Sequence, residues 1–222
     1  GVNHDFIRAL ESGGIIAFEL VFGYLTARVF LRDRVAIAAF VNLLLLCMMA
    51  ASVVLLMEIA VGRRLIYEVT AWLTGNTLVL TESAYRFGSV RAGGPFAHPI
   101  HAGVFTMLMV AFAILTSTGI AKRIFRAGLI TAGTIATLSS APLIGAVLQF
   151  GLVTYHYMCG RLRILNSWKL FFLALATLFV FLEMTSNRGA IKVLVQLTAL
   201  DPQTGFYRIL IWTFGTENVL AN

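Results

Sequence analysis

The order of apolar and polar positions along the chain predicts several membrane-spanning helices. A helix that crosses a bilayer needs roughly 20 mainly apolar residues. Four segments meet this requirement: residues 15–31, 36–61, 101–120 and 168–184. A short amphipathic stretch, residues 5–11, precedes the first of them.

A fifth apolar segment, residues 127–158, is too long for one crossing. As a single helix it would extend about 48 Å, whereas the apolar core of a bilayer is roughly 30 Å thick. The sequence Ser139-Ser140-Ala141-Pro142 interrupts this segment. We therefore predict a broken helical hairpin at 127–158. The fold class that follows is all-α, a polytopic membrane helical bundle of about six transmembrane helices.

The basic residues support this number of crossings, because short cytoplasmic loops are rich in Lys and Arg. If residues 127–158 cross twice, three basic connections fall on one side: Arg28, Arg32 and Arg34; Lys122, Arg123 and Arg126; Arg161, Arg163 and Lys169. We place these connections in the cytoplasm and both chain ends outside. Residues 1–222 then form a single transmembrane domain, with an outer loop at 62–99 and an outer interfacial segment at 186–222.

Composition excludes several other classes of protein. Of 222 residues, 59% are apolar and 12% are charged, and the mean hydropathy is +0.88. A soluble domain carries about twice that share of charge, and a disordered chain would not contain 17 Phe. The net charge of +7 therefore reflects basic loops and not a nucleic-acid partner.

The chain also lacks the usual sequence motifs of several enzyme classes. Cys47 and Cys159 lie in or beside apolar segments, which excludes a disulfide framework and a cysteine-based metal site. There is no P-loop, no metal-binding HExxH pattern and no Ser/His nucleophile motif. We expect no metal and no cofactor.

Basic residues on the outer side need an explanation, because the orientation rule disfavours them there. Arg86 and Arg91 lie in the outer loop, and Gly93 and Gly94 follow Arg91 closely. Arg91, His98 and the N–H groups that start the next helix would form an anion site. The alternative is an ordinary Gly/Pro turn with an incidental histidine, which this segment taken alone favours.

A second outer group of residues follows the last span. Arg188 lies in Ser186-Asn187-Arg188-Gly189, a sequence that is also typical of a helix C-cap. Arg208 and Trp212 are four residues apart and share one helix face. They form either an interfacial aromatic belt or an arginine beside apolar surface, which suits a lipid-linked phosphate. Residues 190–200 predict an interfacial helix or a packed connecting helix.

Four ionisable residues close to the outer ends of spans have simpler explanations. Glu58 and Glu183 are expected to pair with outer arginines. Arg63 and Arg64 directly follow a span, and the sequence leaves open whether they simply extend to lipid headgroups.

These segments together carry a family resemblance. Over residues 58 to 222 the chain contains, in order, Glu58-(x)3-Gly62-Arg63; Arg91-x-x-Gly94-x-Phe96-x-His98-Pro99; Leu138-Ser139-Ser140-Ala141-Pro142; and Ser186-Asn187-Arg188 completed by Thr204-Gly205-Phe206-Tyr207-Arg208-x-x-Ile211-Trp212. With these motifs the chain resembles the O-antigen ligase and polysaccharide polymerase (Wzy-type) family of bacterial membrane glycosyltransferases.

The resemblance implies a function and a location. It implies inverting, metal-independent transfer of a glycan from an undecaprenyl diphosphate carrier to a sugar acceptor, on the periplasmic face of the bacterial inner membrane. Arg188 and Arg208 would be catalytic, since they would stabilise charge on the leaving diphosphate. The candidate substrate-binding residues are Arg91, Arg86, His98 and Trp212. The implied partners are the lipid-linked glycan, the bilayer and further protein chains.

The chain also departs from the family pattern. The family commonly has Arg where this chain has Ala141. Members continue into a Pro/Gly-rich segment and a His-Asn motif, whereas this sequence ends at Asn222. We therefore expect the chain to be a fragment of a longer protein.

The sequence keeps three functions open. Within the family it does not choose between a ligase and a polymerase. A non-catalytic membrane subunit that retains the fold in a larger complex is the second reading, supported by the missing His motif. An anion transporter is the third, because the broken segment 127–158 suits one.

Overall fold

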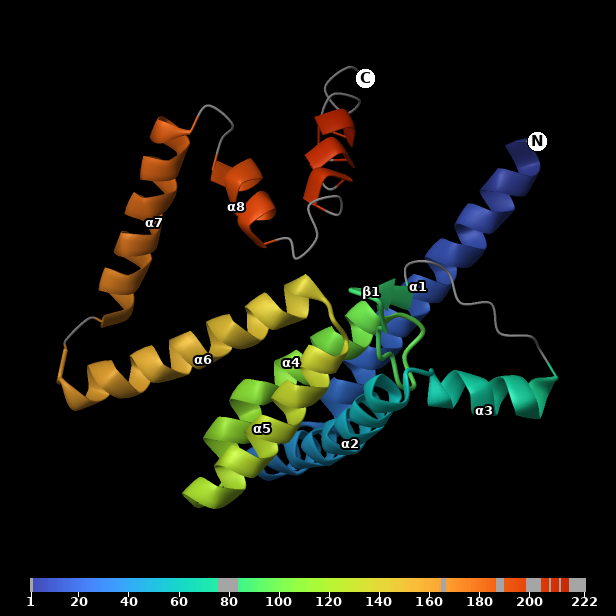
Figure 1. The fold of residues 1–222 in the computed structure, drawn as a ribbon, viewed down its shortest axis with the longest axis horizontal. Coiled ribbons are helices and arrows are strands. Elements are labelled where there is room, and N and C mark those ends of the chain that lie inside the picture. The colour runs from blue at the N-terminus through green and yellow to red at the C-terminus, as the bar shows by residue number, and fades with distance from the viewer. Residues whose placement is uncertain are drawn as a thin grey trace. The chain divides into compact units, whose positions relative to one another are not determined.

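The computed structural model describes residues 2–75, 84–164, 167–186, 190–198, 205–207, 209–211 and 213–215. Helices dominate these residues (Figure 1), which confirms the all-α class. The long helices are α1 (Val2–Phe30), α2 (Arg34–Val61), α4 (Pro99–Thr116), α5 (Ile120–Ala136), α6 (Ser140–Arg161) and α7 (Ser167–Thr185). Two shorter helices, α3 (Leu65–Thr74) and α8 (Ala190–Thr198), and a ribbon of β1 (Tyr85–Arg86) and β2 (Ser89–Val90) complete the fold.

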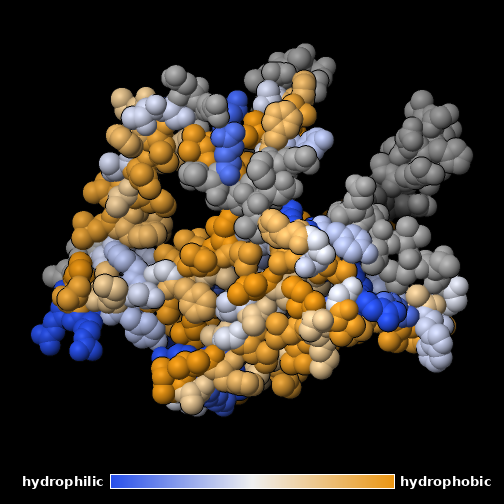
Figure 2. Space-filling view, in the orientation of Figure 1, coloured by the Kyte–Doolittle hydropathy of each residue, from blue (hydrophilic) through white to orange (hydrophobic). Residues whose placement is uncertain are grey.

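Five described helices are long and apolar enough to cross a membrane: most of α1 from Gly13, and all of α2, α4, α6 and α7. Many large apolar side chains on these helices are exposed, and the face drawn in Figure 2 is mainly apolar. Exposed apolar surface of this extent is stable only where lipid or another protein covers it. The helices therefore support a polytopic membrane protein, while the sixth crossing stays a prediction.

The predicted break in residues 127–158 is present. Helix α5 ends at Ala136 and α6 begins at Ser140. Leu138 between them has a φ of +47°, a left-handed conformation that an α-helix cannot continue through. Pro142 fits in the first turn of α6, where a backbone N–H has no helical acceptor.

The predicted start of the hairpin was wrong. Helix α5 already begins at Ile120, so Lys122, Arg123 and Arg126 lie in its first two turns and not in a loop. At 17 residues α5 is also shorter than the five candidate spans. The amphipathic stretch 5–11 is part of the same continuous helix as the first predicted span, α1.

The chain divides into two compact units, residues 1–47 and 48–222. In the first unit, Asp33 caps α2, because its Oδ1 accepts the N–H of Ala36 at 2.7 Å. In the second unit, α4 packs against both α5 and α6. Helix α8 contacts α6 and α7, which favours the packed connecting helix over the interfacial one.

Small residues let the helices of the second unit approach closely. A Cβ on Gly103 of α4 would lie 2.6 Å from Pro142 and 2.7 Å from Thr137. Buried hydroxyls add polar contacts, since Thr134 donates to Thr106 Oγ1 at 3.0 Å. Such close backbone approach and hydroxyl pairing are typical of helix packing within membranes. This packing fixes the positions of the N-terminal ends of α4 and α6 and the C-terminal end of α5, where the candidate site lies.

Candidate anion-binding site

The β1–β2 hairpin positions the two arginines that the sequence singled out in the outer loop. Tyr85 pairs with Val90, and Arg86 pairs with Ser89. Phe87 and Gly88 at the turn have φ angles of +53° and +75°, as a two-residue hairpin turn requires. Arg91 follows β2 directly, so a tight turn brings Arg86 and Arg91 to the same end of the bundle.

Both arginines bind the break between α5 and α6. Arg86 donates from Nη1 to the carbonyl oxygen of Leu138 at 2.8 Å. Arg91 donates from Nε to the carbonyl oxygen of Thr137 at 3.3 Å and from Nη2 to Ser139 Oγ at 2.7 Å. Carbonyls at the C-terminal end of a helix carry partial negative charge and lack helical donors. The Ser-rich break therefore orients two guanidinium groups.

Arg91 is buried in a positively charged environment. Only 4% of its surface is exposed. Burial, followed by repulsion from Arg86 and Arg64, lowers the pKa of Arg91 to about 10. Arg91 remains a cation at neutral pH, so this end of the bundle concentrates positive charge. We call Arg64, Arg86 and Arg91 the arginine cluster.

Arg64 belongs to this cluster, which the sequence did not predict. It is 4% exposed, so the suggestion that it extends to lipid headgroups is wrong. Its Nη2 donates to the carbonyl oxygen of Phe96 at 3.0 Å, and its Cζ lies 4.1 Å from the ring centroid of Tyr67. Its buried Nε has no hydrogen-bond partner among the described residues. The position of Tyr67, three residues after Arg64, was the one available signal for a cation–π contact.

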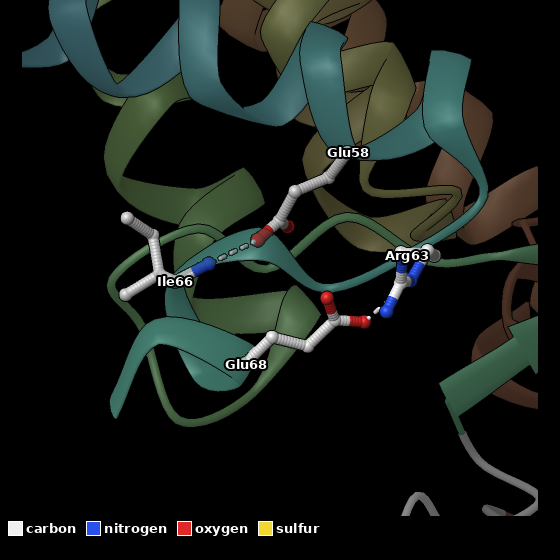
Figure 3. A network of polar contacts seen from close by, with 4 residues as sticks. All are labelled: Glu58, Arg63, Ile66 and Glu68. Atoms are coloured by element: carbon white, nitrogen blue, oxygen red, sulfur yellow. Dashed lines mark hydrogen bonds and ion pairs between the residues drawn. The ribbon is translucent and has the colours of Figure 1, made fainter. Parts of the chain in front are cut away.

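Glu58 anchors the loop that carries the cluster. Its side chain is fully buried. Oε2 accepts the N–H groups of Gly93 at 2.9 Å and Gly94 at 2.8 Å, and Oε1 accepts the N–H of Ile66 at 3.4 Å (Figure 3). The nearby pair of Arg63 and Glu68, also drawn in Figure 3, is largely exposed.

The two glutamates were expected to pair with arginines, and the structure gives both of them backbone partners. Glu58 accepts the three N–H groups described above, and Glu183 Oε2 accepts the N–H of Ala190 at 2.6 Å. Ala190 is the first residue of α8, so Glu183 caps that helix at the end where negative charge is stabilising. Both carboxylates thus hold backbone segments in place.

His98 caps the start of α4 beside the cluster. Its Nδ1 accepts the N–H of Ile100 at 3.2 Å, so in the neutral ring the proton is on Nε2. Burial lowers the pKa of His98 below 6.5, and the charges of Arg91, His101 and Arg64 lower it further. At neutral pH His98 therefore presents a neutral N–H donor and not a cation.

The His98 cap predicts a pH dependence of stability. The unfolded chain binds a proton at His98 near pH 6.5, whereas the folded chain binds it only at lower pH. Stability should therefore be complete above about pH 6.5 and fall as the pH drops through the lowered pKa. His98→Asn keeps an N-cap acceptor without titrating, so its thermal midpoint should vary less with pH. The exposed His101→Asn is the control, and an equal flattening in both variants would contradict the assignment.

The structure places some of the candidate site residues and not others. It brings together Arg86, Arg91 and His98. Arg188, Arg208 and Trp212 lie outside the described residues. Among the residues that the structure describes, no group of three or more His, Cys, Asp or Glu lies close enough to hold a metal ion. The groups that the described part of the site presents are guanidinium and N–H donors, which suit oxyanions.

Comparison of the chain with protein-family models, with curated proteins and with solved structures found no match.

Proposed function

We propose that this protein is a bacterial membrane glycosyltransferase of the O-antigen ligase or polymerase type. It would transfer a glycan from an undecaprenyl diphosphate carrier to a sugar acceptor at the periplasmic face of the inner membrane. The proposal combines the resemblance of the four sequence motifs with the chemistry of the arginine cluster. The motifs supply the reaction, and the cluster supplies a place for the diphosphate.

The observation that carries the proposal is the burial of Arg91 and Arg64, with the half-buried Arg86 close enough to lower the pKa of Arg91. Burying several positive charges together costs free energy. Such a cluster is stable where a bound anion neutralises the charges. One buried carboxylate, Glu58, contacts the same loop, and its described hydrogen bonds go to backbone N–H groups. Among the residues that the structure describes, three guanidinium groups lie near this one buried carboxylate. A diphosphate carries the opposite charge and binds guanidinium groups in a bidentate manner.

The location of the cluster suits a lipid-linked substrate. Arg91 and Arg86 bind the end of a hairpin of membrane helices, where a polyprenyl diphosphate would place its charged group. In the transfer step the bond between the sugar anomeric carbon and the diphosphate oxygen breaks, the acceptor hydroxyl oxygen bonds to that carbon, and the hydroxyl proton passes to water or to the leaving diphosphate. Arginines aimed at the diphosphate would stabilise the charge it gains on leaving.

Arg91→Lys in the native protein tests the proposal. Lysine keeps the charge but cannot reproduce the guanidinium fork, so diphosphate binding and glycan transfer should each weaken about tenfold or more. The matched control is Arg63→Lys, because Arg63 is exposed and pairs with Glu68. Binding of undecaprenyl diphosphate in detergent and glycan transfer in vesicles are the measurements. Unchanged binding and transfer in Arg91→Lys, with an intact fold, would exclude a diphosphate site at the cluster.

A further inference from the structure

The turn that joins α4 to α5 contains buried polar atoms without partners among the described residues. It lies at the opposite end of these helices from the arginine cluster. Ser117 ends α4 and is 4% exposed. Its Oγ and the Nε of Arg123 are both buried, and neither has a hydrogen-bond partner among the described residues. Arg123 Nη2 donates to the carbonyl oxygen of Ser117 at 3.5 Å, so the guanidinium lies beside this serine. Two buried polar atoms at one place indicate a missing partner.

The positive charge around this turn favours an anion as the missing partner. The N-cap of α5 is Gly119, which makes no side-chain cap, so the first N–H groups of α5 remain available as donors. Lys122 and Arg126 lie in the same two turns as Arg123. The sequence contains no Asp or Glu between residues 83 and 182, so α4, α5 and α6 supply no carboxylate. An oxyanion could accept from Arg123 Nε, Ser117 Oγ and the helix N–H groups together.

The exposed apolar side chains beside the turn favour an anion that carries acyl chains, that is, a phospholipid. Three large apolar residues near Arg123 are strongly exposed: Ile120 at 69%, Ile124 at 64% and Phe125 at 63%. Ile120 and Ile124 are four residues apart and share one face of α5. A soluble phosphate would leave this surface bare, whereas the acyl chains of a phospholipid would cover it.

We propose that the α4–α5 turn binds the phosphate group of an anionic phospholipid. Arg123 and Ser117 hold the phosphate oxygens, and Ile120, Ile124 and Phe125 contact the acyl chains. The 17 residues of α5 separate this turn from the arginine cluster by about 25 Å. The lipid site therefore lies at the opposite end of these helices from the proposed diphosphate site and does not depend on the proposed function. Basic pockets between membrane helices are known to suit anionic headgroups.

The test is native mass spectrometry of the detergent-solubilised native protein titrated with phosphatidylglycerol. Arg123→Gln should weaken lipid binding about tenfold, since it removes a charge-assisted hydrogen bond. Arg123→Lys keeps the charge without Nε and should weaken binding about threefold. Ser117→Ala should also weaken it about threefold, because it removes one neutral hydrogen bond. Lys122→Gln loses the same charge at an exposed neighbouring position and is the matched control.

The outcomes separate the ligand sources. Weaker binding in the Arg123 variants than in Lys122→Gln, with glycerol 3-phosphate unable to compete, supports the phospholipid site. Competition by glycerol 3-phosphate at equal concentration would overturn the lipid assignment in favour of a soluble phosphate. Equal effects of Arg123→Gln and Lys122→Gln, or no preference for phosphatidylglycerol over phosphatidylcholine, would overturn the proposal. Arg123→Lys preserves the charge and long stem of Arg123, so it keeps the test decisive if Arg123→Gln does not fold.

Discussion

Glu58→Gln is expected to destabilise the protein by about 2–3 kcal/mol, because it leaves buried N–H groups without an acceptor. The carboxylate offers two acceptor oxygens to Gly93, Gly94 and Ile66. Glutamine offers one oxygen, and its amide N–H groups would face backbone N–H groups. The thermal midpoint in detergent should fall by about 5–10 °C. The loop that carries Arg91 should loosen, so under the proposed function the affinity for undecaprenyl diphosphate should fall as well.

Glu68→Gln is the matched control for this prediction. Glu68 pairs with Arg63 at 2.8 Å, and their side chains are 38% and 65% exposed. An exposed pair of this kind contributes less than about 1 kcal/mol. The control should therefore keep a thermal midpoint close to that of the unchanged protein. If both variants lowered the midpoint equally, Glu58 would not be the anchor of the loop.

Gly133→Ala should cost about 1–3 kcal/mol, the usual range for overpacking a tight interface. A Cβ at this position of α5 would lie 2.5 Å from Ser52 Oγ and 2.9 Å from the Cα of Ser52 in α2. The Cα belongs to a helix backbone, so the clash cannot be relieved by rotating a side chain. The helices must move apart, which weakens the dispersion contacts along their interface.

Gly128→Ala in the same helix provides the opposite result. Nothing lies within 4 Å of a Cβ at Gly128, and alanine is the better helix former by roughly 0.8–1 kcal/mol. The thermal midpoint should rise slightly in Gly128→Ala and fall in Gly133→Ala. A fall of similar size in both variants would indicate a general intolerance of α5 and not a specific contact with α2.

The lengths of the apolar segments were enough to predict the class of the fold. The apolar segments 36–61 and 168–184 correspond closely to α2 and α7, because only a helix satisfies its backbone within a bilayer. The break at Ser139 was also visible, since Ser and Pro favour the start of a helix over its middle. The start of α5 was missed because basic residues were assigned to a loop. These basic residues lie in the first two turns of α5, at the N-terminal end of the helix, where their charges can reach water or headgroups.

The partners of the charged residues were not predictable. Opposite charges near the same membrane surface suggested that Glu58 would pair with an arginine. The structure shows that buried backbone N–H groups of Gly93 and Gly94 bind it instead. Such groups need an acceptor as much as a cation does, but they are present at every residue and leave no signal in the sequence.

The sequence by itself determined the helices, the break and the excess of basic residues, because these depend on local composition and on the thickness of a bilayer. Only the tertiary structure decided which arginines meet. Arg64 and Arg91 are separated along the chain, and their proximity depends on how Glu58 fastens the loop and how Thr137 and Ser139 bind Arg91. Contacts between distant residues arise from packing geometry, which no local pattern encodes.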